Sequence, residues 1–129
     1  MQASEYYAAV QRVAELVEQK QDYAAAVAVL ESLIHSDLPD MDRSIMCVNM
    51  AVVCDRMGHE THALAWYDHG MALEEPHMRS FAAVKKAEYL WGKGKKQEAI
   101  AIYQRLLELP FHTTPEREQF RQNIARLSA

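Results

Sequence analysis

Residues 47–67 read CVNMAVVCDRMGHETHALAWY, and the same arrangement of anchor residues occurs twice more in the chain. The matching stretches are residues 10–30, VQRVAELVEQKQDYAAAVAVL, and residues 83–103, AVKKAEYLWGKGKKQEAIAIY. In each stretch the first and last anchors are 20 positions apart, and a proline follows, at Pro39, Pro76 and Pro110. Equal spacing in three copies indicates an internal repeat, and such a repeat decides the fold of the whole chain.

Small and large residues alternate at fixed places in the repeat. The small ones are Ala14, Ala51 and Ala87 in the first half of each copy and Ala26, Ala63 and Ala99 in the second half. The large ones are Leu30, Tyr67 and Tyr103. Alanine lets two helices approach closely, and a larger side chain fills the adjoining gap, so this alternation predicts tightly packed helix pairs.

The repeat resembles the tetratricopeptide repeat, a helix-turn-helix unit of about 34 residues with the pattern W-x2-L-G-x2-Y, A-x3-F and P. The matching positions are Val10, Val13, Ala14, Val17, Ala26, Leu30 and Pro39, then Cys47, Met50, Ala51, Cys54, Ala63, Tyr67 and Pro76, then Ala83, Lys86, Ala87, Leu90, Ala99, Tyr103 and Pro110. The resemblance covers residues 4–110 and implies an all-α fold. It implies a right-handed superhelical array of three units over residues 4–39, 41–76 and 77–110, in a single domain over residues 1–129.

Some positions depart from the pattern of that family. The copies follow one another after 37 and then 36 residues, so the extra residues must lie in the loops at 36–41 and 74–78. Gln21 stands where Gly58 and Gly94 mark the turn inside the other two units, and Lys86 takes a position that is usually apolar. These departures predict longer loops between units and leave the phase of the helix around Lys86 open.

The periodicity predicts about seven helices. Six of them are expected over residues 4–20, 22–36, 41–57, 60–75, 77–92 and 95–109. A seventh, over residues 114–128, is signalled by Thr113-Thr114-Pro115-Glu116, which offers a hydroxyl cap, a proline in the first turn and an acid near the helix dipole. Phe120, Ile124 and Leu127 then form one apolar stripe, as expected of a helix that caps the last repeat.

Composition and charge narrow the classes of function. Half of the 129 residues are apolar, a quarter are charged and the net charge is −4, which fits one globular domain and disfavours nucleic acid as a partner. Neither a secretory signal nor a run of membrane-spanning length is visible, so the expectation is a soluble, cytoplasmic protein without a membrane partner.

The residues that usually carry catalysis or bind metals lack the necessary spacing. His59 and His62 are three positions apart, not the four that a zinc-protease helix requires. His62 and His69 are seven positions apart, and we interpret them as ordinary surface histidines. Cys47 and Cys54 are too far apart on a helix for a disulfide, and we interpret them as core residues. With only four glycines there is no phosphate-binding loop. We therefore expect no catalytic site, metal or cofactor, and no enzyme.

The register of the family places a set of side chains on the inner, concave surface of the array. This predicted partner-binding groove consists of Gln11, Glu15, Glu18, Ile45, Val48, Asn49, Val52, Asp55, Phe81, Val84, Lys85, Glu88 and Trp91. Its middle is apolar and its rim is mostly acidic. An apolar patch with a polar rim commonly marks an interaction site, so we expect a peptide or partner helix with apolar anchors and flanking Lys or Arg.

Three alternatives remain open at this level. The chain is expected to act as an interaction module or small chaperone-like adaptor, but the first repeat could instead mediate self-association, giving a homodimer or an assembly component. The seventh helix or a second copy could cover the groove. The basic residues between Arg79 and Lys96 are either a solvated surface or a site for an acidic partner.

The family also includes a well-known mode of binding, in which Lys, Asn, Asn, Lys and Arg grip the terminal carboxylate of chaperone tails. The resemblance puts Gln11, Glu15, Asn49, Phe81 and Lys85 at those five positions. Asn49 alone matches in kind, and Glu15 would repel a carboxylate. We therefore expect chaperone tails to bind weakly or not at all.

Overall fold

The computed structural model describes residues 1–129 and contains only helices. Its elements are α1 (Ala3–Glu18), α2 (Tyr23–Ile34), α3 (Asp40–Arg56), α4 (Glu60–Glu74), the 3-10 helix η1 (Glu75–His77), α5 (Phe81–Gly92), α6 (Lys96–Glu108) and α7 (Thr114–Ser128). The all-α fold class and the number of α-helices are confirmed.

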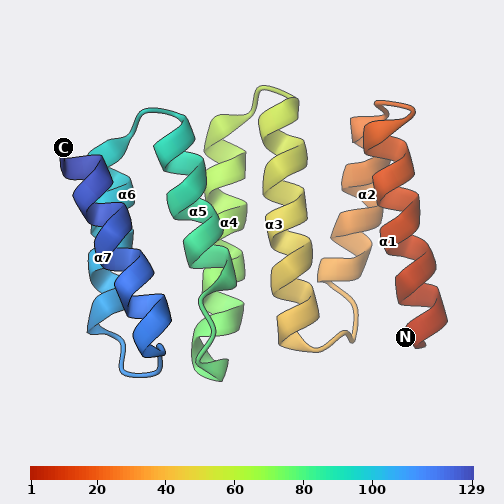
Figure 1. Ribbon diagram of the computed structural model, residues 1–129. Helices are drawn as coiled ribbons and strands as arrows, with labels where there is room; N and C mark the ends of the chain where they lie inside the picture. The colour runs from red at the N-terminus through yellow and green to blue at the C-terminus, as the bar shows by residue number, and fades with distance from the viewer.

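The α-helices form two layers (Figure 1). The odd-numbered helices α1, α3, α5 and α7 stand in one layer, and α2, α4 and α6 stand behind them. Each helix packs on the next one in the chain, and α5 also packs on α3. All odd-numbered helices run in the same direction, so that their N-terminal ends lie at the lower edge of the view.

The turns inside the three units have the same backbone geometry. Gln21, Gly58 and Gly94 adopt positive φ angles of 51°, 80° and 77°. Glycine tolerates this left-handed conformation, whereas an L side chain is disfavoured there. Gln21 therefore occupies the structural place of a turn glycine, which supports the alignment of the first unit with the other two.

The small and large residues that alternate in the repeat lie in the core, with one exception. Ala26, Ala63 and Ala99 have no exposed surface. The large residues four positions later on the same helices, Leu30, Tyr67 and Tyr103, are at most 4% exposed. On the odd-numbered helices Ala51 and Ala87 are likewise fully buried, but Ala14, at the same repeat position in α1, is exposed.

The start of α5 differs from the prediction. A helix was expected from residue 77, but α5 begins at Phe81, after the turn of η1. Pro76 lies in η1, and Met78 at its end has a φ of 57°, which stops helical propagation. The connection between the second and third units is therefore a 3-10 turn followed by a left-handed residue, and not an extension of α5.

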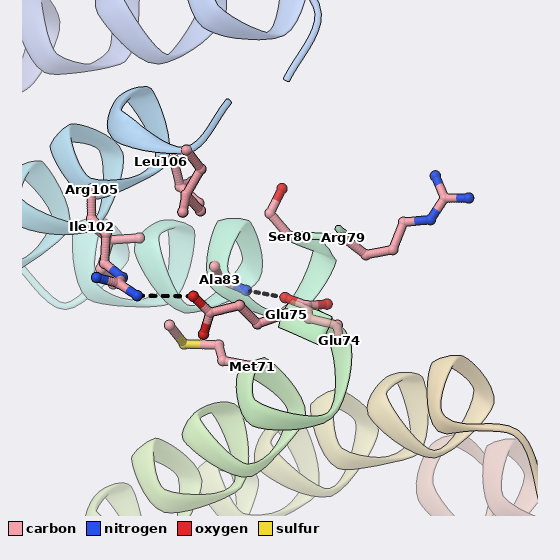
Figure 2. A pocket seen from close by; sticks show the side chains of 10 residues that line it. Met71, Glu74, Glu75, Arg79, Ser80, Ala83, Ile102, Arg105 and Leu106 are labelled. Carbon is pink, nitrogen blue, oxygen red and sulfur yellow. Dashed lines mark hydrogen bonds and ion pairs between the residues drawn. The ribbon is translucent and has the colours of Figure 1, made fainter. Parts of the chain in front are cut away.

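A buried carboxylate joins α4 to the N-terminus of α5 (Figure 2). Glu74 is 1% exposed; its Oε2 accepts the backbone N–H of Ala82 at 2.8 Å and its Oε1 accepts that of Ala83 at 3.1 Å. The hydroxyl of Ser44 lies 3.4 Å from Oε2 and donates to the carbonyl of Gly70 at 3.0 Å. Burial raises the pKa of Glu74, and the backbone hydrogen bonds partly offset that rise.

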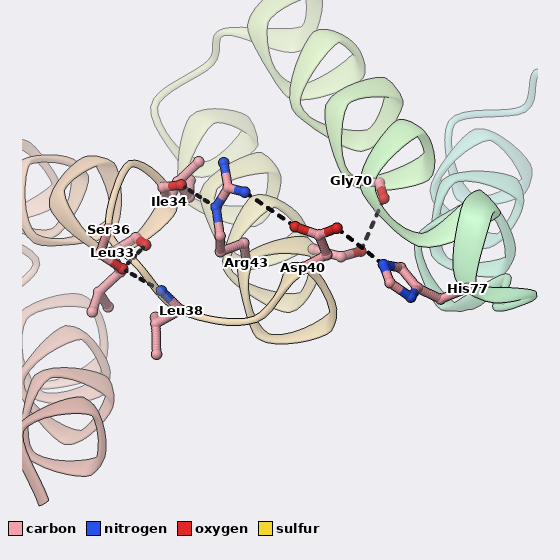
Figure 3. A network of polar contacts seen from close by, with 9 residues as sticks. Leu33, Ile34, Ser36, Leu38, Asp40, Arg43, Gly70 and His77 are labelled. Carbon is pink, nitrogen blue, oxygen red and sulfur yellow. Dashed lines mark hydrogen bonds and ion pairs between the residues drawn. The ribbon is translucent and has the colours of Figure 1, made fainter. Parts of the chain in front are cut away.

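The joint between the first and second units also depends on polar side chains (Figure 3). Nε of Arg43 donates to the carbonyl of Ile34 at 2.6 Å, and Nη1 donates to Asp40 at 3.2 Å. Asp40 in turn accepts from Nε2 of His77 at 2.9 Å, and this bond lowers the pKa of Asp40. Arg43 thus satisfies a carbonyl at the C-terminal end of α2, and the network reaches from there to η1.

The seventh helix begins as predicted. The Thr113 hydroxyl accepts the N–H of Glu116 at 3.3 Å, and the Glu116 carboxylate accepts the N–H of Thr113 at 2.9 Å, which completes a capping box. Phe120 and Leu127 are buried against the third unit. None of the helices combines the length and the apolar character that crossing a membrane requires.

Candidate functional site

The surface of α1, α3 and α5 carries the side chains that were predicted to contact a partner, and we call it the groove face. Seen in Figure 1, these helices form the front layer, and α2, α4 and α6 stand behind them. Ala8, Ile45 and Phe81 occupy the same repeat position on the three helices, and all three are exposed. Ile45 is 36% exposed and Phe81 is 40% exposed, which is high for large apolar side chains.

The predicted groove residues differ in how far they are exposed. Gln11, Glu18, Ile45, Val52, Phe81 and Glu88 are exposed, and Glu15, Asn49, Asp55, Val84, Lys85 and Trp91 are half-buried. Val48 is only 6% exposed and belongs to the hydrophobic core. It is buried because α3 contacts α2, α4 and α5, so more of its circumference is covered than in α1. Val48 therefore does not line an accessible groove.

An apolar cleft separates α1 from α3 on the groove face. Its volume is about 190 Å³, and its walls are Val10, Val13, Ala14 and Val17 from α1 and Val52 and Val53 from α3, with Glu18 and Asn49 beside them. Ala14 is exposed here, whereas Ala51 is buried at the same repeat position one unit later. Val52 is 40% exposed at the edge of the cleft. The cleft can accept an apolar side chain of about the size of valine or leucine.

Each acidic residue of the predicted rim has a basic partner within the protein. The pairs are Arg12–Glu15 at 3.5 Å, Arg56–Glu18 at 3.1 Å, Lys93–Asp55 at 3.0 Å and Lys85–Glu88 at 3.4 Å. The Lys93 ammonium and the Tyr89 hydroxyl both donate to Asp55, and they hold the pKa of Asp55 below its usual value. The rim is therefore close to neutral locally, although the sequence alone suggested an acidic one.

The chemistry that this face offers is apolar contact and hydrogen bonding. No group of three or more His, Cys, Asp and Glu side chains lies close enough together to hold a metal ion. Cys47 and Cys54 are both buried, and burial raises the pKa of the Cys47 thiol to about 11. A thiol with such a pKa stays protonated at neutral pH and is a poor nucleophile or metal ligand.

Two large exposed apolar side chains lie outside the predicted groove, and of these only Met78 was not foreseen from the sequence. Tyr7 is 67% exposed on α1, and Met78 is 65% exposed in the segment before α5. Tyr7 lies four positions before Gln11, so helical periodicity places both on one side of α1. No sequence periodicity indicates the exposure of Met78, because that exposure depends on the left-handed turn after η1.

Comparison with known proteins identifies the repeat directly. Residues 82–112, which include α6 and all of α5 except its first residue, match a family described as Tetratricopeptide repeat. The comparisons with curated proteins and with solved structures give no match. The match covers the third unit of the array, and the arrangement of seven α-helices is consistent with a helical repeat.

Proposed function

We propose that the protein is a protein–protein interaction module, an adaptor that binds a peptide or a partner helix on its groove face. The observation that carries this proposal is the row of exposed apolar side chains on successive units, Ile45 and Phe81, beside the open apolar cleft at Val52. Members of this family are generally non-catalytic interaction modules, which is consistent with such a role. A chaperone-like role would use the same surface.

The partner is expected to present apolar anchors with flanking Lys or Arg. The anchors would enter the cleft between α1 and α3 and cover Ile45 and Phe81, and this burial would supply most of the affinity. To pair with the acidic rim, the Lys or Arg side chains of the partner would have to replace the protein's own basic residues there, which are Arg12, Arg56, Lys85 and Lys93. Exposed ion pairs contribute only about 0–1 kcal/mol each, so we expect these charges to affect orientation and association rate more than affinity.

A variant pair tests the groove face. A random 12-residue peptide library would be selected on the parent protein, and the recovered peptides would be titrated against Val52→Asp and against Ala101→Asp. Val52→Asp adds a charge at the cleft, whereas Ala101 is an exposed alanine on α6, in the other layer. We expect binding to fall about tenfold or more in the first variant only, with unchanged helicity in both. Val48→Asp would not serve, because a buried unpaired charge would unfold the core.

Two outcomes would contradict the proposal. If the library yields no peptide with measurable affinity, the protein is not a peptide-binding module of this kind. If peptides bind Val52→Asp as tightly as they bind the parent, the groove face is not their site. Glu15→Lys provides a separate check on charge, because it should slow the association of peptides with basic flanks and weaken the salt dependence of their association rate.

Self-association through the first unit is a second candidate function. A hollow of about 350 Å³ on α1 and α2 is lined mainly by apolar side chains, those of Met1, Ala9, Ala28, Val29 and Leu33, together with Ser32. A second copy could cover this hollow and form a homodimer. Sedimentation velocity over a concentration series tests it, with Val29→Lys as the variant that places a charge in the hollow. A monomer at every concentration would remove this candidate.

A further inference from the structure

A second hollow lies where the second and third units meet α7. Its volume is about 450 Å³, and it is formed by three parts of the chain that are distant in sequence. Met41 comes from α3. The segment before α5 and its first turn contribute Met78, Arg79, Ser80, Phe81 and Val84, and the loop before α7 and its first turn contribute Phe111, His112, Thr113 and Glu116. The Ser80 hydroxyl and His112 Nε2, hydrogen-bonded at 2.8 Å, tie the last two parts together.

The walls of this hollow are unusually apolar for a solvated surface. Met41, Met78, Phe81, Val84 and Phe111 supply them. Met78 is 65% exposed and Phe81 is 40% exposed. Met78 also has a φ of 57°, a conformation that costs an L residue free energy and that persists where surrounding structure fixes it. The N–H of Met78, bonded to Glu75, and the N–H groups of Ala82 and Ala83, bonded to Glu74, fix this segment.

A positive charge lies beside this hollow. Arg79 lines the hollow, and its guanidinium forms no ion pair or hydrogen bond within the protein. Figure 2 shows Arg79 extending away from the Glu75–Arg105 ion pair. Glu116, the only acid of the hollow, accepts the backbone N–H of Thr113, and this bond lowers the pKa of its carboxyl. The charges of His112 and Arg79 lower the pKa of Glu116 further, but Arg79 makes no direct ion pair with it. An unpaired guanidinium next to apolar walls is complementary to a carboxylate next to an apolar side chain.

We propose that this hollow binds a segment of the partner in which an acidic side chain lies next to a bulky apolar one. The apolar side chain rests on Met78, Phe81 and Phe111, and its neighbouring carboxylate pairs with Arg79. The inference rests on the proposed function, because it assigns one end of the groove face to one part of the partner. It also gives the bound segment a direction, since Glu18 and Asp55, which basic flanks would have to take over from Arg56 and Lys93, lie toward the other end.

The test uses fluorescein-labelled 12-residue peptides selected from a random library on the parent protein. We expect the selected peptides to be enriched in Asp or Glu next to an aromatic residue, Leu or Met. Arg79→Glu should weaken their binding by about tenfold and reverse the preference in a repeated selection from acidic to basic residues. Arg126→Glu is the matched control, because Arg126 is also exposed and unpaired but lies at the far end of α7.

Met78→Gly separates binding from stability. Glycine removes the exposed apolar wall but relieves the left-handed backbone, so the denaturation midpoint should not fall below that of the parent while peptide binding weakens about tenfold. If the peptides show no acidic preference, or bind Arg79→Glu and Met78→Gly as they bind the parent, this inference is overturned. The proposed function still stands in that case, provided that the same peptides lose affinity for Val52→Asp. If no peptide binds the parent at all, both proposals fail.

Discussion

Replacing Glu74 should affect the fold far more than replacing its neighbour Glu75. Glu74→Ala leaves the backbone N–H groups of Ala82 and Ala83 buried without an acceptor and removes the cap of α5. Loss of a helix cap costs about 0.5–2 kcal/mol, and an unsatisfied buried donor costs about 1–3 kcal/mol. Because both donors belong to the same cap, these terms overlap, and we expect a total loss of about 2–4 kcal/mol.

Glu75→Ala is the matched control. The two residues are adjacent and of the same type, but Glu75 is exposed and pairs with Arg105 at 2.9 Å on the surface. Such a pair contributes about 0–1 kcal/mol, so Glu75→Ala should lower the free energy of unfolding less than Glu74→Ala does. Urea denaturation followed by circular dichroism measures both variants. Equal losses would refute the conclusion that Glu74 anchors the start of α5.

The pH dependence of Glu74→Gln adds an independent readout. Burial raises the pKa of Glu74 above its usual 4.5, so the folded state binds this proton more tightly than the unfolded chain does. The contribution of this group to stability is therefore complete below pH 4.5 and is lost as the pH rises through the folded pKa. Glu74→Gln cannot titrate, so its cost relative to the parent should be larger at pH 4.5 than at pH 7. A cost that is independent of pH would mean that the carboxyl is not desolvated.

Four further predictions follow from single features of the array. Gln21→Gly should raise the free energy of unfolding by about 0.5–1 kcal/mol, measured by urea denaturation, because it relieves a left-handed backbone; a loss would show that the turn is not equivalent to the other two. Ala63→Leu should cost about 1–3 kcal/mol in the same assay by overfilling a fully buried contact, and an unchanged midpoint would contradict the register. The thiol of Cys47 should react with Ellman's reagent only on unfolding, because its pKa is raised to about 11, and rapid labelling of the native protein would argue against its burial. Peptides that end like chaperone tails should not bind with micromolar affinity in a calorimetric titration, since Glu15 would repel the terminal carboxylate.

The sequence predicted the helices well because local signals mark their positions and ends. Alanines at fixed spacing placed the close contacts, and Ala63 and Ala99 are indeed fully buried. Prolines marked the ends of units, and the Thr113–Glu116 pair marked the start of α7. Such signals depend on neighbours in the chain, so a single sequence contains them.

Other features depend on how units pack against one another and could not be predicted. The burial of Val48 follows from the number of helices around α3, and the left-handed Met78 follows from the fixed segment around it. The ion pair of Arg56 with Glu18 depends on the angle between α1 and α3, which no local pattern specifies. The role of the groove residues in binding remains a prediction, although their exposure shows which ones a partner can reach.

The core of the array consists of two hydrophobic clusters, and the boundary between them falls inside one helix. Ala82 belongs to the cluster of the first two units, and Ala83 belongs to the cluster of the third unit and α7. Helix α5 is therefore shared by two parts that could each retain a core. We expect amide hydrogen exchange to reveal two cooperative units with different opening free energies, with protection of α6 and α7 lost together. The cooperativity of the whole chain then depends on α5, which contacts the first cluster through Ala82 and Tyr89 and belongs to the second through Ala83.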